Sequence, residues 1–238
     1  METYGLSHTG LVREHNEDRY LIKNLSANTA LLAIADGMGG HCGGEIAAQI
    51  VIDTLQESDL ATPSDARHLS RLIAKANESI HKEAERNPAL LGMGTTATVA
   101  LIDHAVVHWA HVGDSRLYFF GDGRLKQVTT DQNMAQLLID RGEMSPELAR
   151  LSPYRNMLLQ CVGGYDCVPA SGHFEITRGD LLLLCSDGLC GAVPRQRIRS
   201  LLAPGKKMQN TADSLLQAAL ETGGKDNITV VLARPSAT

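Results

Sequence analysis

The chain has 238 residues, 43% of them hydrophobic and 21% charged, a balance typical of a globular protein with a substantial core. A formal net charge of −5, without a basic run, gives no support to nucleic-acid binding. The N-terminus does not resemble a secretory signal, and no run reaches the roughly 20 apolar residues of a membrane helix. The five cysteines form no C-x-x-C pair, and no linker divides the chain. We therefore expect a cytoplasmic protein without a membrane segment, and one domain over residues 1–238.

The first clear elements are one strand and two helices. Residues 29–35 form a short, almost wholly apolar run that predicts a buried strand. Residues 45–55 repeat apolar side chains at helical spacing. Residues 62–86 do so over a longer stretch, after a capping cluster that ends in Asp65.

Strand-like runs dominate from residue 95 onward. These runs cover residues 95–102, 104–112, 116–128, 180–187 and 227–234. Asp122-Gly123 suits a type I′ hairpin turn, because both residue types tolerate positive φ. Residues 133–151 and 208–224 have helical patterns, and Gly223 is well placed to end the second. Antiparallel groups of strands with helices between them predict an α+β fold, with helices packed outside antiparallel sheets.

A glycine-rich stretch, LLAIADGMGGHCGGEIAA at residues 31–48, follows the first predicted strand. The dinucleotide fingerprint G-x-G-x-x-G fails here because Cys42 stands where a glycine is needed, and no Gly-Lys-Ser/Thr follows for a P-loop. A plain tight turn remains an alternative for Asp36-Gly37 taken alone.

Three more aspartates share the setting of Asp36. Asp114, Asp187 and Asp226 each lie at the end or start of a predicted strand, beside glycine or a small polar residue. Carboxylates gathered at one point repel one another and take up protons unless cations join them. Oxygen ligands without a His or Cys cluster favour Mg²⁺ or Mn²⁺ over zinc, and two such ions can activate a water as nucleophile. The sequence therefore predicts a metal centre, and the glycines would let it approach the backbone.

Six motifs, in order, carry a resemblance to a known family: GLVREHNED, ADGMGGHCGGE, GMGTTATVALI, HVGDSRLY, CSDGL and GGKDNIT. Over residues 5–232 they closely resemble the metal-dependent Ser/Thr protein phosphatases of the PPM (PP2C-type) family, especially its compact bacterial branch. The resemblance implies an α-β-β-α sandwich, in which two antiparallel β-sheets pack face to face with helix pairs outside. It also implies hydrolysis of phosphoserine and phosphothreonine in proteins, by in-line attack of a metal-bridging water.

The same resemblance implies a set of metal ligands for two Mn²⁺ or Mg²⁺ ions and for the third ion seen in bacterial members. Asp36 would bridge the two core ions, and Gly37 would bind through its carbonyl. Asp187 and Asp226 would complete the second site, and Asp114 would share the third ion with Asp187.

Residues near the N-terminus would complete the implied site. Glu17 and Asp18 would act mostly through metal-bound water, and Arg13 would bind the phosphate, since a planar guanidinium matches its geometry. Eukaryotic members carry a histidine directly after Asp-Gly as general acid, whereas this chain has Met38 there, as bacterial members do. We therefore name His41 as the candidate proton donor.

Several implications concern substrates and neighbouring structure. The family has a mobile flap beside the active site, here residues 141–160, for which an ordinary surface loop and helix is the alternative. Gln132 stands where the family usually has histidine, which puts the packing around Asp131 in question. Phosphoprotein substrates and a partner Ser/Thr kinase follow by implication, and a small domain without a membrane anchor is most simply expected to be a monomer. Two other functions stay open: a metal-dependent hydrolase of small phosphomonoesters, and a non-catalytic relative that binds phosphoproteins.

Overall fold

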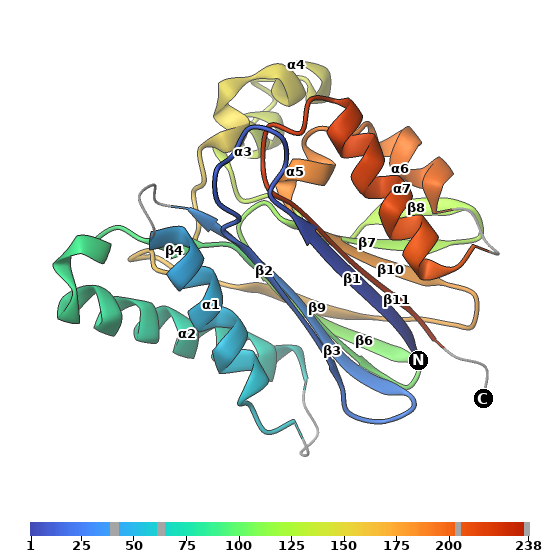
Figure 1. Cartoon of the computed structure of the whole chain (residues 1–238), viewed down its shortest axis with the longest axis horizontal. Helices are drawn as coiled ribbons and strands as arrows, with labels where there is room; N and C mark the ends of the chain where they lie inside the picture. Colours follow the sequence, from blue (N-terminus) through green and yellow to red (C-terminus); the bar gives the residue numbers. More distant parts are fainter. Residues whose placement is uncertain (39–42, 61–64, 203–205, 236–238) are drawn as a thin grey trace.

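The computed structural model describes residues 1–38, 43–60, 65–202 and 206–235, which form four layers (Figure 1). Two antiparallel sheets pack face to face in the middle. The first sheet has the order β1 (Glu2–His8), β11 (Ile228–Arg234), β10 (Leu181–Cys185), β7 (Arg116–Gly121) and β8 (Arg124–Gln127). The second has the order β2 (Asp18–Asn24), β3 (Thr29–Met38), β5 (Ala97–Asp103), β6 (Val106–Val112) and β9 (Ala170–Glu175), and β4 (Gly94–Thr95) pairs with the end of β3.

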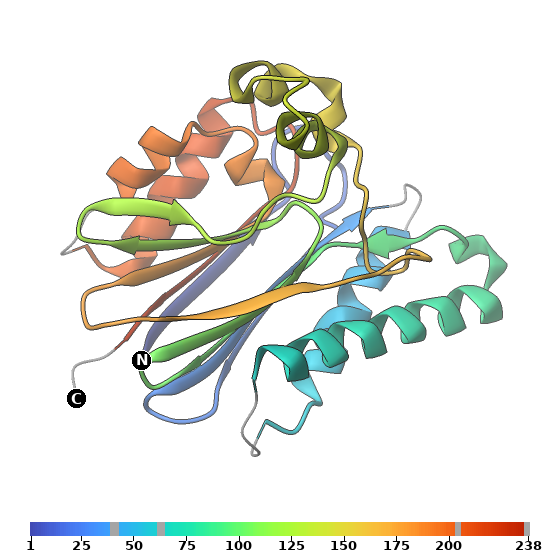
Figure 2. The same ribbon diagram turned by 180° about the vertical axis from the view of Figure 1, so that it is seen from behind.

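Helix pairs cover the outer faces of the sheets, as Figure 1 and Figure 2 show from opposite sides. The second sheet is covered by α1 (Gly43–Gln56) and α2 (Ala66–Arg86), and the first by α6 (Arg195–Leu201) and α7 (Met208–Glu221). The remaining helical segments are α3 (Met134–Asp140), α4 (Pro146–Leu151), α5 (Asp187–Cys190), η1 (Pro88–Leu90) and η2 (Pro153–Asn156). No described helix is long and apolar enough to span a bilayer. The α-β-β-α sandwich expected from the sequence is therefore confirmed.

Three apolar layers hold the sandwich together, and burial of such surface is the main stabilising contribution in folding. Fully buried Leu32, Leu182 and Val231 pack between the two sheets. Ala48 and Ile73 belong to the layer between the second sheet and its helices, which has a counterpart beneath α6 and α7. Because β-strand side chains alternate, each central strand supplies two of these layers, and its sequence is therefore almost continuously apolar.

The local signals in the sequence are mostly confirmed. Asp65 caps α2 by accepting from the His68 backbone N–H at 2.8 Å. Asp122 and Gly123 both have positive φ, 50° and 68°, as the predicted hairpin turn requires. The predicted strand at residues 29–35 is longer than expected and continues through Met38, so Asp36 lies within β3 and not after it.

Two strands and a short helix carry no clear sequence signal: β1, β9 and α6. In β1, Gly5 interrupts the run of larger side chains that would mark a strand. The Tyr20 ring of β2 lies against this glycine, and a Cβ on it would be 2.5 Å from Tyr20 Cε2. All seven residues of β1 nevertheless pair with β11. Long-range pairing, which a local pattern cannot report, determines this strand.

Candidate metal centre

Asp18 and Asp36 are opposite one another on the paired strands β2 and β3. The Asp18 side chain is buried, and its Oδ2 accepts hydrogen bonds of 2.7 Å from both Ser186 Oγ and Thr229 Oγ1 of the other sheet. Its Oδ1 is also buried but has no hydrogen-bond partner. A buried carboxylate oxygen without a donor is costly, and a cation is one way to satisfy it.

The backbone of Asp36 is held firmly while its carboxylate stays available. Its N–H donates to Thr96 Oγ1 at 3.0 Å, and its carbonyl accepts from the Thr96 N–H at 2.8 Å and from Thr95 Oγ1 at 2.9 Å. The Asp36 carboxyl group also lies within hydrogen-bonding reach of Asp187. The motif around Thr95 therefore positions Asp36 and leaves its side chain for another partner.

Asp187 and Asp114 complete what we call the carboxylate cluster, defined as Asp18, Asp36, Asp114 and Asp187. Asp187 begins α5 directly after β10, and Asp114 follows β6 with 8% of its surface exposed. The Asn133 side chain lies within reach of Asp114 and opposes the rise of its pKa. Four carboxylates from four separate strand ends therefore meet at one end of the sandwich.

The electrostatics of the cluster follow from this crowding. Burial, together with the charges of neighbouring aspartates, raises the pKa of Asp18 to about 7, that of Asp114 to about 8 and that of Asp187 to about 6. Burial and the charges of Asp18, Asp187 and Asp114 raise the pKa of Asp36 well above its ordinary value. Without cations, the cluster therefore retains protons that isolated carboxyl groups would lose.

Asp226 and Arg13 lie at the exposed side of the cluster and pair with each other. Arg13 Nη2 donates to Asp226 Oδ2 at 2.9 Å, and the two side chains are 52% and 38% exposed. This hydrogen bond and the charge of Asp226 raise the pKa of Arg13. The structure thus brings Arg13 to the site, but with a protein carboxylate as its partner.

Asn227 is a positioning residue that sequence reasoning missed. Its Nδ2 donates to the carbonyls of Thr9 and His15 at 2.9 Å each, and its Oδ1 accepts from the Glu17 N–H at 2.8 Å. One buried amide thus fixes the loop between β1 and β2, which carries Arg13. The motif GGKDNIT contains this asparagine, but the contacts join positions more than 200 apart in the sequence, so no local pattern could assign them.

Two glycines of the ADG stretch have a packing role in addition to the one expected from the sequence. The ideal Cβ position on Gly37 collides with the carbonyl of Gly44, and a Cβ on Gly44 would lie 2.6 Å from the Met38 nitrogen. At these two positions the backbones of β3 and α1 approach each other, and the expectation that the glycines admit a metal remains a prediction. His41 and Cys42 lie outside the described residues, and the prediction for His41 is not tested.

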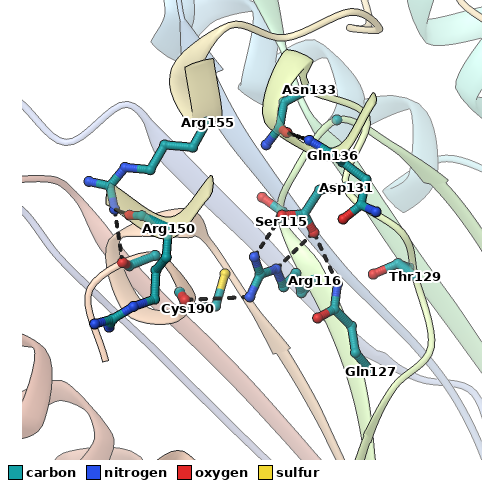
Figure 3. Close-up of polar contacts among 12 residues, drawn as sticks. Ser115, Arg116, Gln127, Thr129, Asp131, Asn133, Gln136, Arg150, Arg155 and Cys190 are labelled. Atoms are coloured by element: carbon teal, nitrogen blue, oxygen red, sulfur yellow. Dashed lines mark hydrogen bonds and ion pairs between the residues drawn. The ribbon is translucent and has the colours of Figure 1, made fainter. Parts of the chain in front are cut away.

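A second charged group, the partly buried pair of Arg116 and Asp131, is drawn in Figure 3, and the charge of Asp131 helps to raise the pKa of Asp114. Arg116 binds Asp131 through two hydrogen bonds, Nε–Oδ1 at 2.8 Å and Nη2–Oδ2 at 2.6 Å, and Gln127 Nε2 donates to the same Oδ1 at 3.0 Å. Gln132 exchanges bonds with Gly113: its Oε1 accepts from the Gly113 N–H at 2.9 Å, and its own N–H donates to the Gly113 carbonyl at 2.8 Å. The glutamine therefore leaves the packing around Asp131 intact, and the doubt raised by the sequence is removed.

A cavity of about 660 Å³ separates the two charge groups from the segment at residues 141–160. Its lining includes Asp114, Asp187 and Asp226 together with side chains of α3 and α4. Arg155 Nη1 donates to the carbonyls of Arg150 and Gly191, each at 3.1 Å, which ties this segment to the end of α5.

The residues present fit hard divalent ions, although the described His, Cys, Asp and Glu side chains include no group of three already arranged around one ion. The fit rests on two observations: the unpartnered Oδ1 of buried Asp18, and carboxylates whose mutual repulsion raises their pKa values. Mg²⁺ keeps several waters and often binds only one or two carboxylates, so few protein ligands per ion are needed.

Comparisons with known proteins point to one family. A family model described as protein phosphatase 2C matches residues 5–224. The chain is 39% identical to the serine/threonine protein phosphatase PstP of Mycobacterium tuberculosis, over 95% of this chain but only 43% of PstP. It is 34% identical to the serine/threonine phosphatase stp of Listeria monocytogenes, covering 94% of this chain and 91% of that relative. Against protein phosphatase PhpP of Streptococcus pneumoniae the identity is 32%, covering 98% and 96%.

Solved structures agree with these sequence matches. A crystal structure of Mycobacterium tuberculosis PstP superposes with a TM-score of 0.89 at 37% identity, covering 99% of both chains. The catalytic domain of PstP in complex with two manganese ions superposes with a TM-score of 0.88 at 35% identity, covering 99% and 98%. The chain thus spans less than half of full-length PstP but nearly all of the PstP chain in these structures.

Proposed function

This chain belongs to the protein phosphatase 2C family, and on that premise we propose that it hydrolyses phosphoserine and phosphothreonine in proteins with bound Mn²⁺ or Mg²⁺. The observation that carries the proposal is the carboxylate cluster: none of the described ion pairs involves its four aspartates, and the buried Asp18 Oδ1 has no partner. The Listeria and Streptococcus relatives, which match over more than 90% of their length, bear the names of serine/threonine phosphatase and protein phosphatase.

The ions would be held at the cluster and its exposed side. Divalent ions at such a site lower the pKa of water and neutralise charge on a phosphoryl group. The residues that would hold them are Asp36, Gly37, Asp114, Asp187 and Asp226, with Glu17 and Asp18 acting through water. Asp36 is suited to a central role because its backbone is fixed on both sides and its carboxylate reaches Asp187.

Arg13 would bind the phosphoryl group. Its guanidinium is half exposed, and Asp226 is its partner in the one ion pair described for it. To bind a phosphoryl oxygen, Arg13 would have to break this one exposed contact. Exposed ion pairs of this kind contribute only about 0–1 kcal/mol, so breaking the pair with Asp226 costs little free energy. A planar guanidinium can then bind two phosphoryl oxygens at once.

His41 remains our proposed proton donor, because it follows Asp36 by five positions in the chain. A donor to the leaving alkoxide must be protonated, so activity should fall at high pH as the donor loses its proton. His41→Gln should lower kcat and remove this alkaline limb from the pH profile of kcat. An unchanged profile would contradict the role.

Further parts of the proposal concern the chain as a whole. Residues 1–238 would act as one phosphatase domain, in which residues 141–160 serve as a flap, since this segment covers the cavity. We infer that the substrates are shared with a Ser/Thr kinase and that the protein is a cytoplasmic monomer. The four described cysteines are free thiols, which supports a reducing compartment. Light scattering during gel filtration would test the monomer.

Phosphate release tests the central proposal. The purified protein is incubated with a phosphothreonine peptide or p-nitrophenyl phosphate, with Mn²⁺ or with EDTA, and Asp36→Asn serves as the inactive control. Manganese-dependent release from the peptide supports the proposal. Release from p-nitrophenyl phosphate alone would favour a hydrolase of small phosphomonoesters, and phosphopeptide binding without release would favour a non-catalytic relative.

A further inference from the structure

The cavity beside the carboxylate cluster is lined by more positive charge than the proposed reaction uses. Arg150 at the end of α4, Arg195 at the start of α6 and Lys225 before β11 all contribute to its lining. Among the described ion pairs of the chain, none involves these three side chains. In Figure 3 the Arg150 guanidinium takes part in none of the drawn contacts, whereas its carbonyl accepts from Arg155.

The stability of α6 does not explain the charge of Arg195. Helix N-termini favour acidic residues, yet the first turn of α6 carries Arg195 and Arg197, and Arg199 adds a like charge four positions after Arg195. The helix is anchored instead by buried Ile198 and Leu201. Arg195 Nη2 does donate to the Leu125 carbonyl, but a neutral donor could make that bond.

The sequence around Arg195 is also rich in positive charge. Residues 188–212 contain five lysines and arginines and no acidic residue, in a chain whose net charge is −5. This stretch begins at the wall of the cavity and runs through α6. Arg195 is the one of these five cations that lines the cavity.

Charge balance within the cavity points in the same direction. Asp131 is neutralised by Arg116, and the proposed ions would neutralise Asp114, Asp187 and Asp226. Arg150, Arg155, Arg195 and Lys225 would then leave the cavity with a net positive charge. A concave site of one sign attracts groups of the opposite sign.

We propose that this cavity is a specificity subsite that takes a second anionic group of the phosphoprotein substrate, a carboxylate or another phosphoryl group, carried near the phosphoserine or phosphothreonine. This inference rests on the proposed phosphatase function. A volume of about 660 Å³ is within the usual range for a ligand pocket. Guanidinium groups bind carboxylates and phosphates alike, so both sources share one chemistry.

Three phosphothreonine peptides of equal length test the subsite. The first has neutral flanks, the second has Asp and Glu within four positions on both sides, and the third has phosphoserine at one of those positions. We expect kcat/KM for phosphothreonine hydrolysis to be about tenfold higher for the anionic peptides, the effect of one charge-assisted hydrogen bond. The advantage should shrink as salt is raised.

Substitutions in the lining of the cavity distinguish an effect of the subsite from an effect of positive charge elsewhere on the surface. Arg150→Gln combined with Arg195→Gln should remove most of the advantage by raising KM for the anionic peptides, while kcat/KM for the neutral peptide stays unchanged. Arg197→Gln is the matched control, because Arg197 lies on the same helix but outside the lining of the cavity. It should keep the full preference.

The outcomes are distinct. A preference for both anionic peptides, or for the doubly phosphorylated one alone, supports the subsite and identifies the group that it takes. Equal hydrolysis of all three peptides, or an equal loss in Arg197→Gln, would overturn the subsite while the phosphatase function stands. Failure to release phosphate from any peptide with Mn²⁺ would instead defeat the proposed function, and the subsite with it.

Discussion

Two charged groups, one partly buried and one buried, lie at the same end of the sandwich, and they are balanced in opposite ways. In the first, Asp131 is bound on both oxygens by Arg116 and also accepts from Gln127. In the second, the carboxylate cluster, hydroxyl and amide donors reach Asp18 and Asp114, while Asp18 Oδ1 has no partner. None of the described ion pairs involves an aspartate of the cluster.

The charges of the paired group stabilise the fold, whereas those of the carboxylate cluster are suited to binding a ligand. A buried ion pair with complete hydrogen bonding needs nothing further, and it holds β7 against the segment before α3. A cluster of like charges destabilises the fold until a cation binds. Breaking the first group should therefore affect stability, and breaking the second should affect metal binding and activity.

The largest effect is expected from Asp36→Asn. Loss of the central carboxylate should lower kcat for phosphothreonine peptides by at least about 100-fold, the scale seen when one group that stabilises developing charge is removed. The metal-free variant should also melt at a higher temperature than the wild type, because one of the repelling carboxyl groups has become neutral. Activity assays and thermal unfolding with EDTA measure both effects, and near-normal activity would show that Asp36 is not essential.

Arg116→Met tests the paired group. The substitution leaves Asp131, whose side chain is 9% exposed, without its counter-charge. Breaking a fully buried pair in this way costs about 3–5 kcal/mol of unfolding free energy, and this partly buried pair should cost up to that amount. Urea unfolding should show this loss, whereas Mn²⁺ affinity measured by calorimetry on the folded variant should change little. The double variant Arg116→Met/Asp131→Asn should recover part of the stability. A variant that keeps its stability but loses Mn²⁺ binding would reverse the assignment of the two groups.

The pH dependence of the metal-free protein sharpens the contrast. The folded-state pKa values of Asp18 and Asp114, about 7 and about 8, exceed the ordinary value of 3.8, so between these values the folded chain binds more protons than the unfolded chain. Stability should therefore fall as pH rises toward 8. Burial lowers the pKa of His111 to about 4, which produces the opposite trend below 6.5. The pH range in which His111 does not oppose the effect of the aspartates therefore begins above 6.5.

Thermal unfolding at about pH 6.5 and about pH 8, with EDTA or Mn²⁺, measures this dependence. The melting temperature with EDTA should drop at the higher pH, and Mn²⁺ should raise it more there, because ions and protons compete for the same carboxylates. A metal-free melting temperature that rises over this window would contradict the raised pKa values.

Gln132→Ala should have the smallest effect. It removes the acceptor of the Gly113 N–H, close to the paired group, and should cost about 1–2 kcal/mol of stability. Activity per folded molecule should remain near normal, because Gln132 belongs neither to the carboxylate cluster nor to the lining of the cavity. Urea unfolding and the peptide assay test this together, and a selective loss of activity would show that the Gln132–Gly113 contact controls the reaction.

The sequence predicts the sandwich fold and the candidate ligands, but it does not predict the contacts that position those ligands. Asp36, Asp114, Asp187 and Asp226 are visible because each stands at a strand end or beside one, next to glycine or a small polar residue. The roles of Ser186 and Asn227 are not visible, because each depends on a contact between segments far apart in the chain. Short-range patterns likewise find the buried strands but miss β1, whose limits depend on its pairing with β11.

The metal centre is best tested by diffraction from crystals grown with Mn²⁺, recorded where manganese scatters anomalously. We expect at least two anomalous peaks in the space bounded by Asp18, Asp36, Asp114 and Asp187, with Asp36 in contact with both ions and the Arg116–Asp131 pair unchanged. The same space without manganese, or ions bound only elsewhere on the surface, would contradict the claim that these carboxylates are reserved for cations.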